Sequence, residues 1–321
     1  MKISIKALLF MMTTLITTNA SAQKISSNQT EPIPVVQLSN NVEMPLLGFG
    51  TLRLPKDSIA ECVSQAIQIG FRLIDAAKNY ANEEEVGRGI KMSGIDRKEL
   101  FITSKLWIKD YVYEQAKQAF QATIDRLGVE YLDLYLLHQP FGDIHGAWRA
   151  LEELYREGKI RAIGISNFFP DRMIDLCYTS TIRPMVNQVE FSPYYQQWKA
   201  KEWNDKYGVQ MEAWGAMICG THPEIFTDST LVSIGKKYKK SAAQVILRYL
   251  TQRGVVTLCC TGNPKHMQED YDIFDFSLTE QEMHRIDLMD KGHTMSKNHR
   301  APEDVEWFHE KSTRTLQIRN K

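Results

Sequence analysis

The sequence predicts an α/β fold: an eight-stranded (β/α)8 TIM barrel with an N-terminal β-hairpin. Short apolar runs typical of buried strands alternate with amphipathic helical segments along most of the chain. Several runs end on a polar residue, and parallel strands would bring these residues to one rim, where α/β barrels keep their chemistry. A doubly wound sheet would also alternate, but the G-x-G-x-x-G fingerprint follows none of the runs.

The predicted elements follow in order. Residues 35–44 hold two short extended runs around Ser39-Asn40-Asn41, which is typical of a hairpin. Amphipathic helical segments, such as 113–127 and 144–157, separate the later strands. The interval 215–240 predicts a long loop over the barrel mouth, and residues 291–321 predict a tail that folds back. The eight strand-like runs end near Gly50, Asp75, Lys105, His138, Asn167, Gln188, Trp214 and Cys260.

Charge and cysteine content narrow the class of protein. The chain carries 39 basic and 39 acidic residues, so it has no net field that would attract nucleic acid or an acidic membrane. Its cysteines are odd in number and scattered, which does not indicate a disulfide framework, and no spacing is typical of a metal site. Cys259 and Cys260 are neighbours in a predicted strand and should point to opposite faces. We expect packing to be their main role.

The N-terminus differs from the rest. Lys2 and Lys6 precede a short apolar run, and Ala20-Ser21-Ala22 follows it, as in a secretory signal peptide. The apolar run is shorter than the ~20 residues that span a bilayer. We therefore expect a signal peptide over 1–22, a linker over 23–34 and a catalytic domain over 35–321. This organisation predicts a periplasmic or secreted protein, cleaved near Ala22, with no stable membrane span after cleavage.

Four polar residues on the predicted rim form a proton-handling set: Asp75, Tyr80, Lys105 and His138. An ammonium beside a phenol favours the phenolate and lowers the ordinary tyrosine pKa of ~10. A buried lysine needs an anion, which Asp75 can supply. His138 could hydrogen-bond a carbonyl oxygen beside Tyr80. Such a set can protonate an oxyanion while a cofactor delivers hydride to a carbonyl, and it requires no metal.

Several motifs make the chain resemble an aldo-keto reductase over residues 35 to about 290, in a bacterial branch like the diketogluconate reductases. The resemblance implies an eight-fold barrel in which Tyr80 donates the proton, Lys105 lowers its pKa, Asp75 pairs with Lys105 and His138 positions the carbonyl. The motifs are Met44-Pro-Leu-Leu-Gly-Phe-Gly-Thr51, Gly70-Phe-Arg-Leu-Ile-Asp-Ala-Ala-Lys-Asn-Tyr80, Asn82-Glu-Glu-Glu-Val-Gly87, Ile102-Thr-Ser-Lys105, Leu136-Leu-His-Gln-Pro140 and Gly164-Ile-Ser-Asn167.

The resemblance also implies a nicotinamide cofactor. Ser166, Asn167 and Gln188 match positions that bind the carboxamide, and Trp214 matches the aromatic that stacks on the nicotinamide ring. The remaining cofactor positions carried over are Gly50, Thr51, Thr261, His266, Glu269 and Asp270.

The chain departs from the family pattern where the adenosine 2′-phosphate is gripped. Cys260 and His266 stand at the Lys and Arg positions, although lysine and arginine are the usual phosphate partners. Lys265 could substitute as a point charge. The cofactor is therefore NADPH or NADH, with the preference open. Leu52 and Gln139 stand where many relatives carry Trp, which suggests a less aromatic pocket for smaller or more polar carbonyls.

Two functions remain open from the sequence. The first is NAD(P)H-dependent reduction of an aldehyde or ketone to an alcohol by a monomer. The second is an exported barrel that binds a small carbonyl or sugar with little or no turnover, because general secretion carries an unfolded chain and free NADPH is scarce outside the cytoplasm. The intact set of eight site residues, the four on the rim together with Ser166, Asn167, Gln188 and Trp214, favours the enzyme. The substrate is not readable from the sequence.

Overall fold

The computed structural model describes residues 33–319. For Cys219 and for residues 311–319 it describes the backbone only. The chain divides into two units, residues 1–30 and 31–321, and all described elements belong to the second. The predicted leader and all but the last residues of the predicted linker lie outside the described residues. None of the described helices is both long enough and apolar enough to cross a membrane.

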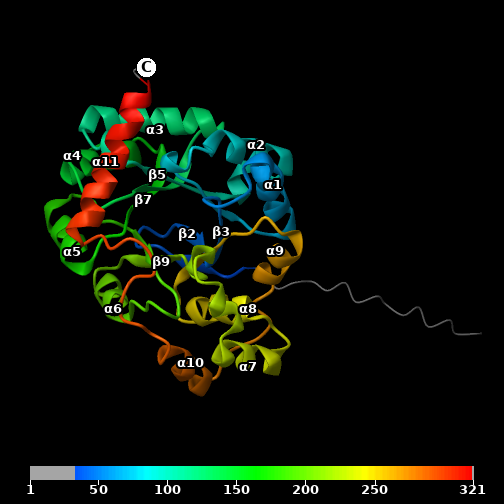
Figure 1. Cartoon of the computed structure of the whole chain (residues 1–321). Coiled ribbons are helices and arrows are strands. Elements are labelled where there is room, and N and C mark those ends of the chain that lie inside the picture. Colours follow the sequence, from blue (N-terminus) through cyan, green and yellow to red (C-terminus); the bar gives the residue numbers. More distant parts are fainter. Residues whose placement is uncertain (1–32, 320–321) are drawn as a thin grey trace, which may run out of the picture. The chain divides into compact units, whose positions relative to one another are not determined.

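Eight parallel strands close into a barrel surrounded by helices (Figure 1). The order around the barrel is β10-β3-β4-β5-β6-β7-β8-β9, so each strand pairs with its sequence neighbour and β10 pairs with β3. This is the predicted (β/α)8 barrel. Its strands are β3 (Leu47–Gly50), β4 (Leu73–Asp75), β5 (Phe101–Leu106), β6 (Leu132–Leu137), β7 (Ile160–Ser166), β8 (Val186–Glu190), β9 (Gln210–Trp214) and β10 (Val256–Cys259).

The helices pack an apolar stripe against these strands. In α3, the residues at helical spacing 116, 119, 120, 123, 124 and 127 are buried, and the helix ends at Gly128, whose φ of 63° suits glycine. The helices are α1 (Ile59–Ile69), α2 (Glu83–Ser93), α3 (Tyr113–Leu127), α4 (Ile144–Arg156), α5 (Pro170–Thr179), α6 (Trp198–Lys206), α7 (Ser229–Tyr238), α8 (Ala242–Thr251), α9 (Pro264–Tyr271), α10 (Glu280–Asp287) and α11 (Pro302–Arg319).

The predicted hairpin is also present, as β1 (Val35–Gln37) and β2 (Glu43–Pro45). They pair antiparallel, with Val36 opposite Met44. The turn between them contains Asn41 at a φ of 65°, a left-handed conformation that asparagine tolerates better than most residues. Because β2 leads directly into β3, the hairpin lies at the amino-terminal end of the barrel, opposite the rim that carries the polar residues.

A close backbone approach explains one motif glycine. A Cβ at Gly164 in β7 would lie 2.6 Å from the carbonyl oxygen of Val186 in β8. Any larger residue would push these paired strands apart. The rim residue Asn167 directly follows β7, and Gln188 lies in the middle of β8, opposite Ser166. Gly164 therefore helps to set the spacing of the site.

The segment 215–240 is more ordered than the predicted loop. It contains the 3-10 turns η5 (Ile218–Gly220) and η6 (Pro223–Thr227) and then α7. Asp228 caps α7, since its carboxylate accepts the backbone N–H groups of Thr230 and Leu231. The C-terminal tail does fold back, ending in α11.

Candidate active site

Three of the four predicted rim residues meet around one ammonium group. Lys105 on β5 donates from Nζ to Asp75 Oδ1 at 2.6 Å and Oδ2 at 2.7 Å, at the end of β4. The same Nζ lies 3.2 Å from the hydroxyl of Tyr80, which closes the 3-10 turn η2 (Lys78–Tyr80), and 3.0 Å from the Ala76 carbonyl. The predicted chain of carboxylate, ammonium and phenol is therefore present in space.

Lys105 keeps its charge although it is fully buried. Burial alone would lower the pKa of Lys105, but the Asp75 carboxylate and Tyr80 outweigh that effect and raise the pKa above its ordinary value. Lys105 is thus a permanent positive charge beside the Tyr80 hydroxyl throughout the range in which enzymes are assayed.

His138 follows β6 on the same rim. Its backbone N–H donates to the carbonyl of Leu106 at 3.0 Å, which continues the pairing of β5 and β6. Its ring packs edge-on against two aromatic rings, with centroids 5.8 Å from Tyr80 and 5.1 Å from Trp107. These contacts fix the imidazole beside the phenol, as the sequence predicts.

Asn167 connects three strands of the predicted nicotinamide pocket. Its side-chain amide donates to the carbonyl of His138 at 3.0 Å and to the Ser166 hydroxyl at 3.1 Å, and its Oδ1 accepts from Trp214 Nε1 at 2.9 Å. Asn167 also has a φ of 66°, a conformation that clusters at functional sites when it occurs outside glycine. These contacts hold the Trp214 indole in one orientation.

Gln188 on β8 reaches the Asp75 carboxylate. Its Nε2 donates to Asp75 Oδ2 at 2.9 Å and to Glu212 Oε2 at 3.0 Å. Glu212 on β9 is fully buried and was not among the residues singled out from the sequence. The sequence does contain a signal for Glu212: it stands two positions before Trp214 in the same strand, so both side chains share one face of that strand.

One cavity of about 1100 Å³ collects the predicted site. Lys105 lies beneath its floor rather than in its lining. Thr51 lines it and is anchored to the floor, because its hydroxyl donates to the carbonyl oxygen of Asp75 at 2.9 Å. The predicted residues in the lining are Gly50, Thr51, Asp75, Tyr80, His138, Ser166, Asn167, Gln188, Trp214, Thr261, His266, Glu269 and Asp270.

Aromatic side chains line part of the cavity. Leu52 and Gln139 do line it, where Trp was expected in relatives. Other parts of the chain supply aromatic rings that sequence reasoning did not single out. Trp107 follows Lys105 by two residues, whereas Phe226 and the residues at 307 and 308 lie far from the rim motifs. The aromatic residues in the lining, besides Tyr80 and Trp214, are Trp107, Phe226, Trp307 and Phe308. The expectation of a pocket less aromatic than that of relatives stays a prediction.

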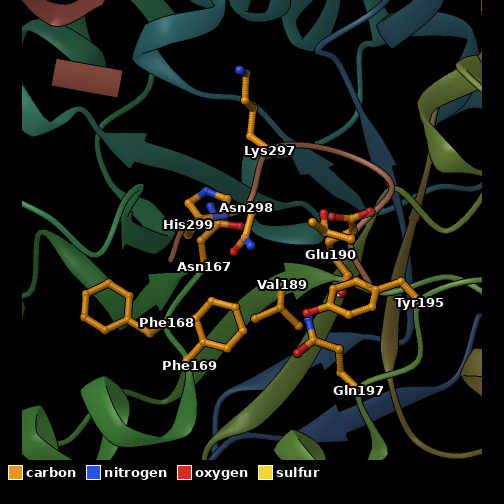
Figure 2. A pocket seen from close by; sticks show the side chains of 11 residues that line it. Asn167, Phe168, Phe169, Val189, Glu190, Tyr195, Gln197, Lys297, Asn298 and His299 are labelled. Atoms are coloured by element: carbon orange, nitrogen blue, oxygen red, sulfur yellow. Dashed lines mark hydrogen bonds between the residues drawn. The ribbon is translucent and has the colours of Figure 1, made fainter. Parts of the chain in front are cut away.

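The C-terminal segment crosses the rim beside Asn167 (Figure 2). Glu190, at the end of β8, fastens it: the carboxylate accepts the Thr294 hydroxyl and the Met295 N–H, the latter at 2.8 Å. Burial raises the pKa of Glu190, although these hydrogen bonds oppose the shift. The ring of His299 is stacked on Phe308 and half-buried, and this burial lowers its pKa to about 4.

The part of the cavity lined by β10 and α9, where the sequence predicts the adenosine of the cofactor, receives little positive charge from these two elements. Cys260, Thr261 and His266 line it, whereas the Lys265 side chain is 81% exposed and lies 3.8 Å from Glu269. Burial raises the pKa of Asp270 to about 7. Within the described part of β10 and α9, no lysine or arginine lines the cavity. Cys259 and Cys260 both line the cavity, although Cys259 is buried and its Sγ lies 3.5 Å from the Gly48 carbonyl oxygen.

Comparison with known proteins identifies the family. Residues 46–291 match the model of the aldo/keto reductase family. The chain belongs to the aldo/keto reductase family. It is 44% identical over 265 residues to glyoxal reductase of Bacillus subtilis, covering 82% of this chain and 95% of the relative. It is 40% identical over 274 residues to morphine 6-dehydrogenase of Pseudomonas putida, covering 81% and 92%.

Solved structures agree with this assignment. An aldo-keto reductase from a Medee basin deep-sea metagenome superposes with a TM-score of 0.81 at 37% identity, covering 83% of this chain and 98% of that one. The Bombyx mori aldo-keto reductase in complex with NADP gives a TM-score of 0.79 at 31% identity, covering 83% and 95%. This reductase therefore acts on small-molecule carbonyls, reducing an aldehyde or ketone to an alcohol with NAD(P)H.

Proposed function

We propose that Tyr80 is the proton donor of this reduction, supported by Lys105 and Asp75. The observation that carries this proposal is the Lys105 ammonium, held between the Asp75 carboxylate and the Tyr80 hydroxyl at the floor of the cavity. A fixed positive charge at 3.2 Å stabilises the phenolate that remains once the proton has moved to the substrate oxygen. His138, packed against the Tyr80 ring, orients the carbonyl oxygen toward that proton.

The nicotinamide cofactor, when bound, supplies the hydride. The residues present fit it: the cavity extends from Tyr80 and His138 to Thr261 and His266, as a dinucleotide requires. Ser166, Asn167, Gln188 and Trp214 would hold the nicotinamide end, with Gly50 and Thr51 close to it. Thr261, His266, Glu269 and Asp270 would hold the adenosine end.

For the cofactor preference, we propose that NADH serves about as well as NADPH. Neither Cys260 nor His266 provides an ammonium or guanidinium group for a 2′-phosphate, and the Lys265 side chain is largely exposed to solvent. A missing charge-assisted hydrogen bond costs about 1.5–3 kcal/mol, or roughly ten- to a hundred-fold in affinity. This reasoning predicts nearly equal dissociation constants for the two nucleotides.

Titration with NADH and NADPH, followed by tryptophan fluorescence, tests the cofactor site. Quenching by both nucleotides, lost in part in Trp214→Phe, is the expected result. A matched change at Trp203, which lies on α6 and does not line the cavity, should leave the quenching intact. Absence of binding by either nucleotide would contradict the proposal and return attention to the binding-protein alternative.

For the substrate, we propose a carbonyl compound with an apolar portion that packs on the aromatic side chains lining the cavity. Two of these side chains are Trp107 and Phe308, whose ring centroids lie 6.5 Å apart. The named relatives, glyoxal reductase and morphine 6-dehydrogenase, refer to compounds of very different size and do not point to one substrate. A panel of aliphatic and aromatic aldehydes would test this, and a preference for small polar aldehydes would contradict it.

For location and assembly, we propose an exported monomer that acts after cleavage near Ala22. The support is the sequence of residues 1–22, with its basic start, short apolar run and Ala20-Ser21-Ala22. Cell fractionation combined with N-terminal sequencing of the mature protein tests the export. An intact N-terminus on cytoplasmic protein would contradict it. Size-exclusion chromatography tests the monomer.

A further inference from the structure

A buried carboxyl group lies one layer below the nicotinamide site. Glu212 is on β9, two residues before Trp214, so its side chain shares the barrel-facing side of that strand. Its neighbours in the barrel are Gln188 on β8 and Val256 on β10. Glu212 is 0% exposed. It has no part in the roles given above to the rim residues.

The hydrogen bonds of Gln188 define what Glu212 does. Asp75 is bound to the Lys105 ammonium and can only accept, so the group that Gln188 turns toward it must be the NH₂ end of the amide. The second amide hydrogen goes to Glu212 Oε2. Both donors are then used between two carboxyl groups. The Gln188 carbonyl oxygen is the atom left to accept from a ligand in the cavity that Gln188 lines.

The protonation state of Glu212 affects the charges around Lys105. The charged groups that face it are Asp75 from β4 and Lys105 from β5, while its pairing partners Gln188 and Val256 are uncharged. Burial, reinforced by the Asp75 charge, raises the pKa of Glu212 to about 8, against the opposing effects of Gln188 and Lys105. At neutral pH Glu212 therefore holds its proton. Its Oε1 has no hydrogen-bond partner among the described residues.

We propose that Glu212 is a positioning residue for carbonyl reduction: it fixes the Gln188 amide so that the carbonyl oxygen accepts from the nicotinamide carboxamide, and its proton keeps a second negative charge away from Lys105. The inference rests on the proposed roles of Gln188 and Tyr80. Loss of the proton at alkaline pH places that negative charge near the Lys105–Tyr80 pair, which disfavours the phenolate. Tyr80 then keeps its proton, and remains a competent acid, to a higher pH.

Two variants separate the two effects. In Glu212→Leu, Gln188 loses one partner and its amide is free to turn. The KM for NADH and NADPH should rise by up to about ten-fold, the effect expected when one supporting hydrogen bond is removed. In Glu212→Gln, the side-chain carbonyl still accepts from Gln188, so the KM should stay near that of the wild type. The titratable proton is gone, however, and the alkaline limb of the kcat profile should move down by about half to one pH unit.

Glu152→Gln is the matched control. Glu152 is another buried carboxyl group, but it lies on α4 outside the barrel and accepts the Ile182 N–H at 2.7 Å. Its replacement should change neither the cofactor KM nor the alkaline limb. Wild-type cofactor KM in folded Glu212→Leu, or an unshifted limb in Glu212→Gln, would overturn the inference. Should Glu212→Leu fail to fold, the Glu212→Gln profile decides.

Failure of the underlying function gives a different result. If the wild type reduced no carbonyl compound, the proposed function itself would fail, and nucleotide affinity from fluorescence would still be measurable in all three variants. A ten-fold weaker affinity in Glu212→Leu alone would then support the positioning of Gln188. Equal affinities in all variants would contradict it.

Discussion

Replacing Lys105 by methionine tests the electrostatic core of the mechanism. The ammonium lies 3.2 Å from the Tyr80 hydroxyl. At an effective dielectric constant of about 20, a unit charge at that distance stabilises a phenolate by about 5 kcal/mol. The Asp75 carboxylate, 2.6 Å from the ammonium, cancels part of this. We therefore expect kcat to fall by about thirty- to a thousand-fold, equivalent to about 2–4 kcal/mol.

Stability must be separated from catalysis in this experiment. Removal of Lys105 alone leaves Asp75 buried without its partner, which typically costs about 3–5 kcal/mol of folding free energy. The double variant Asp75→Asn with Lys105→Met removes both charges and should recover much of that loss without recovering kcat. Steady-state reduction and thermal unfolding, measured on the same preparations, give both quantities. If a folded variant that lacks the ammonium keeps kcat within a few-fold of the wild type, the ammonium does not stabilise the transition state.

Three further predictions concern other parts of the chain. Burial raises the pKa of Asp270 to about 7, so as the pH rises toward 7 the native state keeps a proton that the unfolded chain has already lost. The contribution of this proton to the free energy of unfolding is therefore complete at acid pH and is lost as the pH rises to 7. Asp270→Asn should therefore reduce the drop in Tm between pH 5 and 8, and an unchanged drop would contradict the shift. Gly87→Ala should lower Tm by several degrees in calorimetry, since its Cβ would lie 2.4 Å from the Leu127 carbonyl oxygen; an unchanged Tm would contradict this close packing. Glu190→Gln should weaken the attachment of the segment at Thr294, raising the carbonyl KM about ten-fold but leaving nucleotide affinity unchanged in titrations; a change in nucleotide affinity alone would contradict this role.

The barrel was predictable because its signals are local. Each strand is a short apolar run, and the eight predicted ends fall within two residues of the observed ones, as at Asp75 and Trp214. The helix predicted over residues 113–127 has the observed bounds, because a glycine ends it. The segment 215–240 was predicted as a loop, although it contains α7. This helix depends on the Asp228 cap and on packing against α8.

The rim motifs predicted the four polar residues of the proton-handling set, but long-range packing supplied the rest of the site. Asp75, Lys105 and His138 occupy equivalent ends of consecutive parallel strands, so the topology alone brings them together. Phe308 and His299 come from the C-terminal segment, and no local pattern indicates that this segment crosses the rim. Glu212 was missed because a single glutamate in an apolar strand resembles an ordinary polar residue until its partners are known.

Tyr80→Phe removes the hydroxyl that donates the proton and leaves the aromatic ring in place. Tyr135→Phe is the matched control, because Tyr135 is a buried tyrosine of β6 that packs on Phe120 outside the cavity. We predict that Tyr80→Phe abolishes NAD(P)H-dependent carbonyl reduction while nucleotide affinity stays within a few-fold of the wild type, and that Tyr135→Phe remains active. Carbonyl reduction by Tyr80→Phe at the wild-type rate would contradict the account.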